Sequence, residues 1–580
     1  MERPAKRARL NDDVDGSHAG RSSRSPFSLT HRISPPPATR TRLSATPAEE
    51  DIETSSEAEE DAETDSGSEA ATPRATSERV SEPTQAVPST SPTTSLPSGR
   101  RIFKSPFQLT KIRDLPAASN QDAVTLKDLL GDPLISDCWN FNYLHSIPFL
   151  MSAFDPDVRD LVKVHVVHGF WKKDDGNRLK LEEDAKGFQN VSVHEAYLPE
   201  MFGTHHSKML LLLRHDDTAQ VIIHTANMIH RDWTNMTQAV WRSPLLPLLR
   251  GNKSDEGDAR ATTGSGTKFK ADLLSYLSVY ESRRRRICQP IIDSLSKYDF
   301  SAVKGALIAS VPGRHNIWDD SPTRWGWKAV REALRAVPVQ DGPSEIVVQI
   351  SSIATLGPSP TWLRDTFFSA LSSRKGPAGN SPKPSFKVVF PTADEIRRSL
   401  DGYAAGGSIH TKIQSPQQTK QLQYLRPIFC HWANDAPHGA ALPKDGVIED
   451  AGRQRAAPHI KTYIRYGQKS IDWALVTSAN LSKQAWGEAA NSSGEMRVSS
   501  YEIGVLVWPA LYDEKAVMVP TFRTDEPVVD EAKVEAGQSI VGVRIPYNLP
   551  LQPYGKAETP WVATQSYSEP DWMGQVWEGY

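Results

Sequence analysis

The sequence predicts an α/β protein with two similar α/β/α sandwich domains, related by a pseudo-twofold axis and preceded by a disordered tail. Apolar segments typical of buried strands alternate with segments of helical periodicity in both halves of the chain, which is the pattern of this fold class. One short motif occurs twice at a constant separation, and this indicates that the two domains are duplicates. With 580 residues, of which 38% are hydrophobic, the chain is long enough to form two cores.

The predicted tail comprises residues 1–105, which are rich in Ser, Thr, Pro, Asp and Glu. The first hundred residues contain one aromatic side chain, Phe27, so they bury too little apolar surface to offset the loss of chain entropy. They carry 12 basic and 17 acidic residues, which leaves +2 for the rest of a chain whose net charge is −3. The overall charge therefore does not exclude a basic groove. A basic segment at 4–10 is typical of a nuclear import signal or of an ordinary solvated patch, and we expect a nuclear protein.

We expect the first domain to span residues 106–308 and the second 309–580, because a strand at 305–311 ends in Pro-Gly between them. The expected helices are 124–130, 271–286 and 362–371, and the expected strands outside the motif are 137–143, 162–168, 345–352 and 386–390. Loops are expected at 252–268, 374–384, 435–457 and 525–538. The helix at 271–286 ends in four arginines, 283–286, which form either a solvated helix end or a phosphate-neutralising cluster.

The repeated motif is a His-x-Lys pair followed by an apolar run that ends in Asn. The first copy is His206, Lys208 and Asn227, and the second copy is His459, Lys461 and Asn480. The residue numbers of the two copies differ by 253 at all three positions, which makes coincidence a poor explanation. A third pair, His410 and Lys412, has neither a following strand-borne Asn nor a partner at this separation, and we interpret it as a chance match.

These residue types suggest a chemistry. Strand alternation places the His and Lys of each pair on one face of a sheet, and each Asn is expected at the carboxyl end of the next strand, where α/β sheets present ligand-binding groups. Two imidazoles, two ammonium groups and two amides would form a neutral-to-cationic site with no acidic group among them. Such a site suits a phosphodiester. Because imidazole titrates near neutral pH, one copy can act as nucleophile and the other as acid.

Two His-Lys-Asn sets in one chain resemble the phospholipase D superfamily, whose motif adds an Asp five residues after each Lys. Those positions hold Leu213 and Tyr466 here. The lack of both aspartates resembles the tyrosyl-DNA phosphodiesterase branch, in its fungal-like eukaryotic form, which removes a topoisomerase tyrosine from a DNA 3′ end. Further segments are similar to that branch, namely 141–143, 203–206, 232–233, 237–238, 406–408, 480–487 and 501–506.

The resemblance implies that His206 attacks phosphorus to form a phosphohistidine, and that His459 protonates the departing tyrosine and then activates water. It also implies that Glu502 supports His206 and that Gln238 supports His459. A carboxylate partner raises the basicity of an imidazole, whereas an amide only orients it. The phosphoryl oxygens would be held by the remaining members of the motif, Lys208, Asn227, Lys461 and Asn480.

Contacts with the substrate are implied in the same way. Phe202 and Tyr143 would stack on or line the DNA path, and Trp561 would line the opposite, peptide side. Backbone phosphates would be held by three serines, Ser352, Ser408 and Ser478. The implied substrate is a 3′ end of single-stranded, nicked or broken duplex DNA that carries a tyrosyl peptide from a type IB topoisomerase. We expect a monomer whose tail contacts repair proteins.

Other residue types limit the remaining classes of function. The three Cys residues have neither metal-ligand spacing nor a disulfide framework, so no metal and no other cofactor is expected. No apolar run approaches the roughly 18 residues of a membrane span. Two alternatives stay open, a phospholipase D-like lipid phosphodiesterase or nuclease and a catalytically silent DNA-repair scaffold. The absent aspartates count against a lipid substrate, and the intact pair of sites counts against a scaffold.

Overall fold

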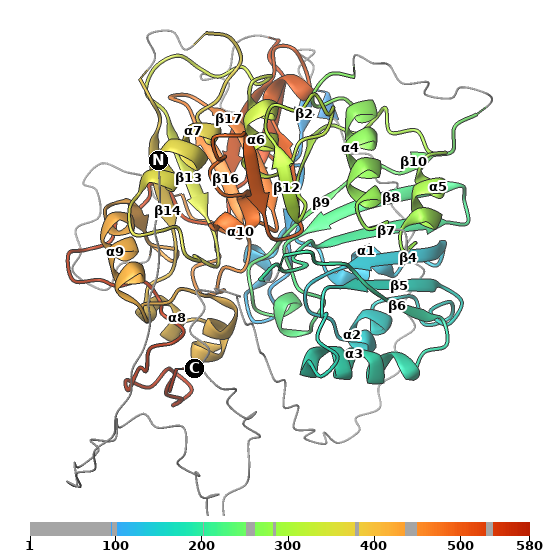
Figure 1. The fold of residues 1–580 in the computed structure, drawn as a ribbon, viewed down its shortest axis with the longest axis horizontal. Helices are drawn as coiled ribbons and strands as arrows, with labels where there is room; N and C mark the ends of the chain where they lie inside the picture. Colours follow the sequence, from blue (N-terminus) through green and yellow to red (C-terminus); the bar gives the residue numbers. More distant parts are fainter. Residues whose placement is uncertain are drawn as a thin grey trace, which may run out of the picture. The chain divides into compact units, whose positions relative to one another are not determined.

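The computed structural model describes residues 94–95, 101–200, 202–250, 261–281, 286–377, 382–434, 449–528 and 537–579. The import-like segment and nearly all of the predicted tail lie outside these residues, as do Arg283 to Arg285 and part of each expected loop. Figure 1 shows two twisted sheets, one from the first half of the chain, in blue to green, and one from the second half, in yellow to red.

The first half forms an eight-stranded sheet within the described residues. Its order is β3 (Phe107–Leu109), β9 (Ala239–Arg242), β8 (Thr218–His224), β7 (Met209–Arg214), β4 (Ile135–Phe141), β5 (Lys163–His168) and β6 (Val191–Glu195), and β10 (Leu246–Pro247) also pairs with β8. Strands β4, β5 and β6 are parallel, and the other neighbours are antiparallel. The central strands are rich in Val, Ile and Leu, which suits a sheet covered on both faces.

The second half repeats this arrangement. Seven strands follow the order β11 (Ala306–Ser310), β19 (Glu502–Val507), β17 (Ile471–Thr477), β16 (Thr462–Tyr466), β13 (Glu345–Gln349), β14 (Ser385–Val389) and β15 (Phe429–Cys430). Their relative directions match those of β3 to β6 strand by strand, with β13, β14 and β15 parallel and the rest antiparallel. The predicted duplication of an α/β/α domain is therefore confirmed.

Other strands add to the second sheet at one end. Beside β17 they are β20 (Val517–Thr521), β21 (Ile540–Arg544), β2 (Arg101–Phe103) and β1 (Thr94–Ser95). A separate antiparallel pair consists of β12 (Gly313–Asn316) and β18 (Glu495–Val498).

Helices cover both sheets. In the first half they are α1 (Leu126–Leu130), α2 (Ile147–Ser152), α3 (Gly176–Lys186), the 3₁₀ turns η1 (Ala117–Ser119) and η2 (Arg231–Trp233), α4 (Gly266–Ser278) and α5 (Gln289–Leu295). In the second half they are α6 (Gly326–Leu334), the π-helix η3 (Trp362–Phe368), α7 (Ser369–Leu371), α8 (Ala393–Arg397), η4 (Gly402–Ser408), α9 (Pro416–Leu425), η5 (Arg426–Ile428), α10 (Lys483–Trp486) and η6 (Pro509–Leu511). Capping boxes at Thr125, Thr392 and Ser415 fix the starts of α1, α8 and α9.

The core is layered because side chains alternate along each strand. Met209 and Leu211 of β7 belong to a central cluster that also contains side chains of α4, α5 and the second sheet. Leu210 and Leu212 of the same strand pack on the other face, against α1, α2 and α3. The outer face of the second sheet is likewise covered by α6, η3 and α8. One continuous apolar cluster thus joins the two halves and holds their inner faces together.

Several predicted boundaries are wrong. Strand β2 lies inside the predicted tail, where it pairs with β21, and β11 crosses the predicted domain boundary between residues 308 and 309. Helix α4 begins within the predicted loop 252–268 and ends at Ser278, before the four arginines. The first two errors share a cause, because β2 and β11 each depend on pairing with a segment far away in the sequence, whereas α4 begins at a local N-cap, Ser265.

Within the described part of the chain, no helix is both long enough and apolar enough to cross a membrane.

Candidate active site

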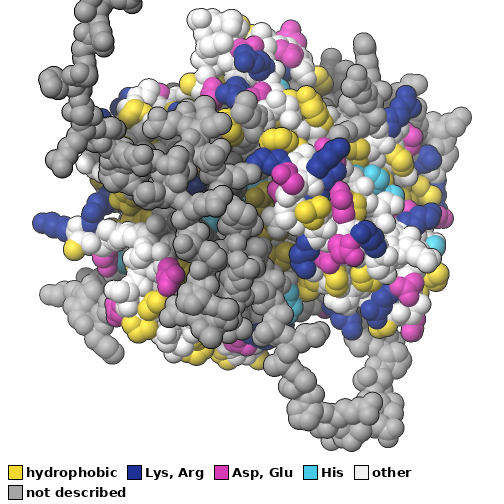
Figure 2. All heavy atoms as spheres, turned by 60° about the horizontal axis from the view of Figure 1, so that its bottom comes forward, with side chains coloured by type: hydrophobic (Ala, Val, Ile, Leu, Met, Phe, Trp, Pro, Cys, Tyr) yellow, Lys and Arg dark blue, Asp and Glu magenta, His cyan; other side chains and the backbone are white. Residues whose placement is uncertain are grey.

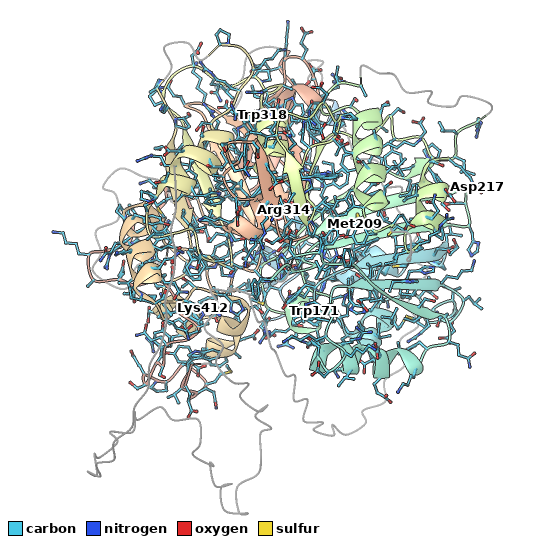
Figure 3. All side chains as sticks on the ribbon, viewed as in Figure 1. Trp171, Met209, Asp217, Arg314, Trp318 and Lys412 are labelled. Atoms are coloured by element: carbon cyan, nitrogen blue, oxygen red, sulfur yellow. The ribbon has the colours of Figure 1, made fainter. Side chains whose placement is uncertain are left out.

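The first His-Lys pair lies in the irregular segment directly before β7, beside the strand and not within it. Side chains alternate along this segment nevertheless. The His205 ring is buried in the core, where its Nε2 lies 2.9 Å from Tyr280 Oη. His206 and Lys208 are one and three residues further along, so alternation places both side chains on the opposite face from His205. Figure 3 places the next residue, Met209, close to where the two halves meet.

The second pair occupies the equivalent place before β16. In both copies the Lys ammonium group donates to the main-chain oxygen of the His two residues earlier, Lys208 to His206 at 3.3 Å and Lys461 to His459 at 2.5 Å. Both Asn residues come three residues after a strand, β8 or β17, and not at its last residue. All six residues of the motif are at most 4% exposed. The structure thus holds both copies in one local conformation.

Main-chain hydrogen bonds join the two halves beside these segments and follow the pseudo-twofold. The His206 N–H donates to Tyr501 O at 3.0 Å, directly before β19. On the other side, the Thr237 N–H donates to Ala457 O at 2.8 Å, and Thr237 O accepts the Ile460 N–H at 2.8 Å, directly before β9. Each His-Lys segment is therefore fixed by the opposite half, through a residue directly before its predicted supporting residue, Glu502 or Gln238.

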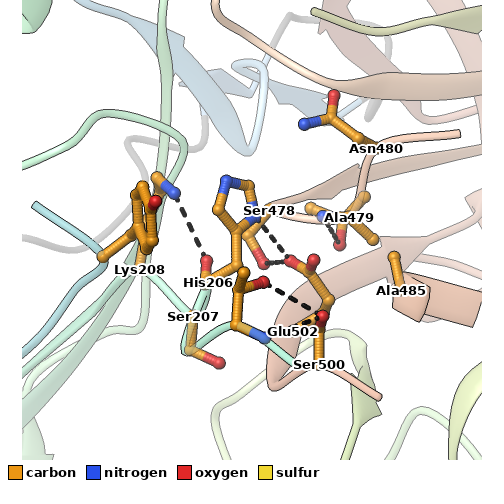
Figure 4. A network of polar contacts seen from close by, with 12 residues as sticks. His206, Ser207, Lys208, Ser478, Ala479, Asn480, Ala485, Ser500 and Glu502 are labelled. Atoms are coloured by element: carbon orange, nitrogen blue, oxygen red, sulfur yellow. Dashed lines mark hydrogen bonds and ion pairs between the residues drawn. The ribbon is translucent and has the colours of Figure 1, made fainter. Parts of the chain in front are cut away.

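Glu502 supports His206 across this junction. Its Oε2 lies 3.0 Å from His206 Nδ1, and both side chains are 5% exposed. Ser478 donates a short hydrogen bond to the same carboxylate oxygen and accepts the Ile503 N–H, which fixes the carboxylate, as Figure 4 shows. Because the carboxylate accepts the Nδ1 proton, Nε2 on the far edge of the ring keeps its lone pair.

His459 is supported by two side chains of the first half. Its Nδ1 lies 3.0 Å from Gln238 Nε2 and 3.1 Å from Asp232 Oδ2. The Thr225 hydroxyl donates to Gln238 Oε1 at 2.8 Å, and Gln238 Nε2 also donates to Asp232 at 3.2 Å. With Gln238 donating to Nδ1, a neutral His459 carries its proton on Nε2. A protonated ring would instead donate its Nδ1 proton to Asp232.

The expectation that His206 has a carboxylate partner and His459 only an amide partner is therefore met in part. His206 has Glu502, but His459 has Asp232 in addition to Gln238. Asp232 is fully buried, and it was not among the predicted site residues. Both imidazoles thus have a carboxylate from the opposite half within hydrogen-bonding distance.

A break in the repeat marks Asp232 in the sequence. Asp232 comes five residues after Asn227, whereas the position five residues after Asn480 holds Ala485. The next residue is Trp in both copies, and its indole N–H donates to the main-chain oxygen of the motif Asn, at 3.0 Å in the first and 2.9 Å in the second. The two segments are structurally equivalent, so the substitution of Asp by Ala at one position is a real asymmetry. Comparing the two copies residue by residue would have found it.

The charges around His459 lower its pKa. Burial has the largest effect, and the nearby Lys461 adds to it, so the pKa falls to about 3 although Asp232 opposes the change. The charge of Lys208 contributes in the same direction. Because His206 contacts Glu502 of the second half, and His459 contacts Gln238 and Asp232 of the first, the two motif copies form one site.

The two Asn side chains are held differently. Asn480 Oδ1 accepts the N–H groups of Ser351 and Ser352 at 3.1 and 3.0 Å, which turns its amide nitrogen away from them. Asn227 is fixed through its main chain, because its N–H donates to Asp232 Oδ2 at 2.6 Å. Asp232 thus contacts both the Asn of its own half and the His of the other half.

Most of the predicted DNA contacts lie near these residues. The Tyr143 ring centroid is 5.8 Å from the His206 ring, and Phe202 is half-buried four residues before His206. Ser408 accepts a hydrogen bond from Arg231 of the first half at 2.8 Å. Ser478 differs from the prediction in its present contacts, because its hydroxyl is used to hold Glu502.

The prediction for Trp561 is wrong. Its side chain is fully buried, and its indole N–H donates to the main-chain oxygens of Gly406 and Ile409 at 3.0 and 2.8 Å. Its ring packs on those of Tyr403 and Tyr567. Trp561 therefore belongs to the core beneath η4, and it presents no surface to a peptide.

Two other features lie apart from the site. Lys412, of the third His-x-Lys pair, lies on the second half, well to the left of Met209 in Figure 3. A cavity of about 440 Å³ is lined by residues of α8, by His431 and by residues 552–569, and its lining includes none of the six motif residues. Within the described ranges, no three His, Cys, Asp or Glu residues are grouped as a metal site would require.

Comparison with known proteins agrees with this geometry. A Schizosaccharomyces pombe protein named "Probable tyrosyl-DNA phosphodiesterase" is 30% identical over 545 residues, covering 82% of this chain and 96% of that protein. Tyrosyl-DNA phosphodiesterase 1 of Arabidopsis thaliana is 31% identical over 505 residues, covering 82% of this chain and 76% of that protein. The crystal structure of the yeast tyrosyl-DNA phosphodiesterase shares the fold, with a TM-score of 0.52 at 20% identity over 79% of this chain and 99% of that one.

The conserved sequence pattern of the tyrosyl-DNA phosphodiesterases matches residues 106–555, which contain both copies of the motif and the residues that support them. On this match and on the similarity to the two relatives, the chain belongs to the tyrosyl-DNA phosphodiesterase family.

Proposed function

We propose that this protein hydrolyses the bond between a tyrosine and the 3′-phosphate of DNA, with His206 as nucleophile and His459 as general acid and then general base. The observation that carries the proposal is the pair of imidazoles, each held through Nδ1 by the opposite half of the chain. This arrangement leaves Nε2 of both rings for the substrate, one with a lone pair and one with a proton.

In the first step, His206 Nε2 attacks phosphorus and forms a P–N bond, while the bond from phosphorus to the tyrosine oxygen breaks. His459 Nε2 gives its proton to that oxygen. Glu502 accepts a hydrogen bond from the Nδ1–H group of His206 and stabilises the positive charge that the ring gains as it attacks. The products are a tyrosyl peptide and a covalent phosphohistidine.

Lys208 and Lys461 would bind the phosphoryl oxygens, together with the two Asn amides. Their buried charges stabilise the negative charge that shifts onto these oxygens in the transition state. The substrate also changes His459. The positive charge of Lys461 lowers the pKa of His459 in the empty site, and an anionic phosphodiester beside it opposes this effect. Substrate binding therefore favours the protonated, acidic form of His459, in which the Nδ1–H group donates a hydrogen bond to Asp232.

In the second step, His459 accepts a proton from water through Nε2, and the water oxygen attacks phosphorus as the P–N bond to His206 breaks. The product is a DNA 3′-phosphate. The second step requires a base where the first required an acid, and one residue supplies both by returning to its earlier protonation state.

The substrate range and the cellular location that we propose are those expected from the sequence. The DNA would be a 3′ end in single-stranded, nicked or broken duplex DNA, contacted by Phe202, Tyr143, Ser352 and Ser408, and the tyrosine would come from a type IB topoisomerase. We propose a nuclear monomer without a metal or other cofactor, whose tail contacts repair proteins. The folded domains would meet near residue 305, before β11, in place of the boundary at 308.

The test uses the full-length protein, a chelator, and a single-stranded oligonucleotide that carries a 3′-phosphotyrosine. We expect conversion to a 3′-phosphate on a denaturing gel, and complete loss of conversion in His206→Ala. His410→Ala, in the third His-x-Lys pair, is the matched control and should keep full activity. No conversion by the wild-type protein, or activity that needs an added divalent ion, would contradict the proposal. Hydrolysis of phosphatidylcholine vesicles would instead support the lipid alternative.

A further inference from the structure

The loop between β5 and α3 presents an exposed tryptophan followed by two lysines. Trp171 is 53% exposed, and Lys172 and Lys173 are exposed as well. The Lys172 ammonium group lies 5.9 Å from the centre of the Trp171 ring. Large aromatic side chains usually bury most of their surface, so an exposed ring beside two cations is a candidate binding surface.

Hydrogen bonds fix this loop at both ends. The Phe170 N–H donates to His168 Nδ1 at 3.1 Å, and Phe170 O accepts from Arg178 at 3.1 Å. Arg178 also pairs with Glu195 of β6 at 3.0 Å. Asp175 ends the loop as the N-cap of α3, where its carboxylate accepts two main-chain N–H groups. The Trp171 ring is therefore presented by a preorganised loop, which lowers the entropy lost on binding.

The same loop packs against the active site. A Cβ at Gly169 would lie 2.4 Å from the Cβ of His205, so the absence of a side chain there lets the loop touch the His-Lys segment. The Phe170 ring lies 6.2 Å from the ring of Tyr143, which in turn lies 5.8 Å from the His206 ring. A row of three rings thus runs from the imidazole of His206 through Tyr143 to Phe170, and Trp171 is the next residue in the chain.

The charge on this side of the molecule is mixed. On the right of Figure 2, basic and acidic side chains are interspersed over the first half. Attraction to an anion here must therefore come from local groups. Lys172 and Lys173 supply two positive charges, and the exposed Asp174 opposes one of them, whereas Asp175 is occupied in capping α3.

We propose that Trp171, Lys172 and Lys173 form a subsite for single-stranded DNA, in which a base a few nucleotides from the scissile phosphate stacks on Trp171 and the lysines bind the adjacent phosphates. The inference rests on the proposed function, because it takes His206 to mark the 3′ end of the strand. Aromatic stacking and lysine–phosphate contacts together are the means by which proteins bind single strands without reading sequence. A peptide is the alternative occupant, but peptide binding to the ring would not require two cations beside it, whereas DNA binding uses them to hold phosphates.

The test measures binding and cleavage separately in the full-length protein. Binding uses a fluorescent single-stranded oligonucleotide of about 12 nucleotides that ends in a 3′-phosphate, and Kd is followed by anisotropy. Cleavage uses two 3′-phosphotyrosyl substrates with the same leaving group, one of that length and one dinucleotide. Trp318→Ala is the matched control, because Trp318 is 65% exposed and lies at the other end of the view in Figure 3.

We expect Trp171→Ala to raise Kd for the long oligonucleotide about tenfold and to leave KM for the dinucleotide unchanged. Trp171→Phe should restore most of the affinity, and Lys172→Ala should lower the slope of log Kd against log salt by about 0.7. An unchanged Kd, or an equal loss in Trp318→Ala, would overturn the subsite. A KM that rises equally for the long substrate and the dinucleotide, which share a leaving group, would assign the loop to the peptide side instead. Wild-type protein that binds the long strand but cleaves neither substrate would refute the proposed function and leave the binding measurement valid.

Discussion

The two halves of this protein are alike in scaffold and different in what surrounds their histidines. Seven strands have the same order and directions in both, and a hydroxyl donates to the supporting residue in both, Thr225 to Gln238 and Ser478 to Glu502. The carboxylate, however, comes from a different position in each half. The first half supplies it from Asp232 and the second from Glu502, with Ala485 in the place of Asp232.

This difference teaches how a duplicated site can perform an asymmetric reaction. The repeat places two imidazoles symmetrically, and a symmetric environment would give them equal protonation states. Because the carboxylate comes from a different position in each half, His206 has a single strong acceptor at Nδ1, Glu502. His459 has both a donor, Gln238, and an acceptor, Asp232, at Nδ1. His459 therefore has a hydrogen-bond partner at Nδ1 whether that atom is protonated or not, whereas Glu502 keeps the proton of a neutral His206 on Nδ1 and the lone pair on Nε2.

The largest effect that tests this comparison is expected for His459→Ala. Without its general base, release of the phosphohistidine should slow by roughly 10²–10⁴-fold. Its formation should slow less, because a tyrosine oxygen, with a solution pKa of about 10, leaves with less help than water needs to attack. A protein–DNA adduct should accumulate on a denaturing gel. If His206→Ala accumulates the adduct and His459→Ala does not, the two roles are reversed.

The halves also differ in their buried histidines, and this predicts how each responds to acid. Burial lowers the pKa of six histidines in the first half, namely His145, His165, His168, His194, His205 and His224, and of two in the second, His315 and His459. For His205 and His224 the pKa falls to about 3. In the second half, burial lowers the pKa of His431 but Glu395 and Glu558 outweigh it, and the pKa rises.

A folded-state pKa below the unfolded value means that the unfolded chain takes up protons first as pH falls. The stability that these groups contribute is therefore present above about pH 6.5, and it is lost as pH falls toward 3–4. Between pH 6.5 and 5 we expect a loss of about 1–2 kcal/mol for each of His205 and His224. Hydrogen exchange should show this loss in β4, β5, β7 and β8 before it appears in β13, β14, β16 and β17. Equal loss in both halves would contradict the prediction.

A third prediction concerns the support of the nucleophile. Glu502→Gln keeps the shape of the side chain but removes the charge that stabilises the His206 ring, and kcat should fall about 10- to 100-fold. The matched change, Gln238→Glu, adds a carboxylate beside His459 and should raise its pKa, which would move the alkaline limb of the pH profile of adduct formation, for which His459 must be protonated, to higher pH. The two profiles, measured side by side, decide whether the supports are interchangeable. A similar loss without any shift in either profile would mean that both residues act only through packing.

The catalytic roles of the six motif residues, and of Gln238 and Glu502, which the family resemblance implied, stay predictions. The sequence was sufficient to predict the duplicated fold, because three residue types at one separation are a local pattern. It failed where the answer depends on contacts between distant segments. The pairing of β2 with β21 moved the predicted start of the fold, and the packing of Trp561 under η4 turned a predicted surface residue into a core residue. Neither contact leaves a trace in the neighbouring residues.

Asp232 is the most informative of these failures, because its partner is the imidazole of the opposite half, 227 positions further along the chain. The last prediction, with the smallest effect, concerns this residue. Asp232→Asn keeps a hydrogen-bonding side chain in place but removes the negative charge that stabilises a protonated His459. We expect kcat to fall about tenfold, in the range found for partners of functional histidines. The alkaline limb of the pH profile of adduct formation should move to lower pH, since the protonated ring loses its stabilising charge.

A purely structural role for Asp232 would give a different result. Its carboxylate also accepts the Asn227 N–H, so its loss could disturb Asn227 without affecting His459. In that event KM should rise, the pH profile should stay in place, and Asp232→Glu should not restore activity. Ala485→Asp completes the comparison, because it adds the missing carboxylate to the second half. If the asymmetry sets the roles, Ala485→Asp should slow the first step, in which His206 must keep its lone pair, and leave the release of the adduct unchanged.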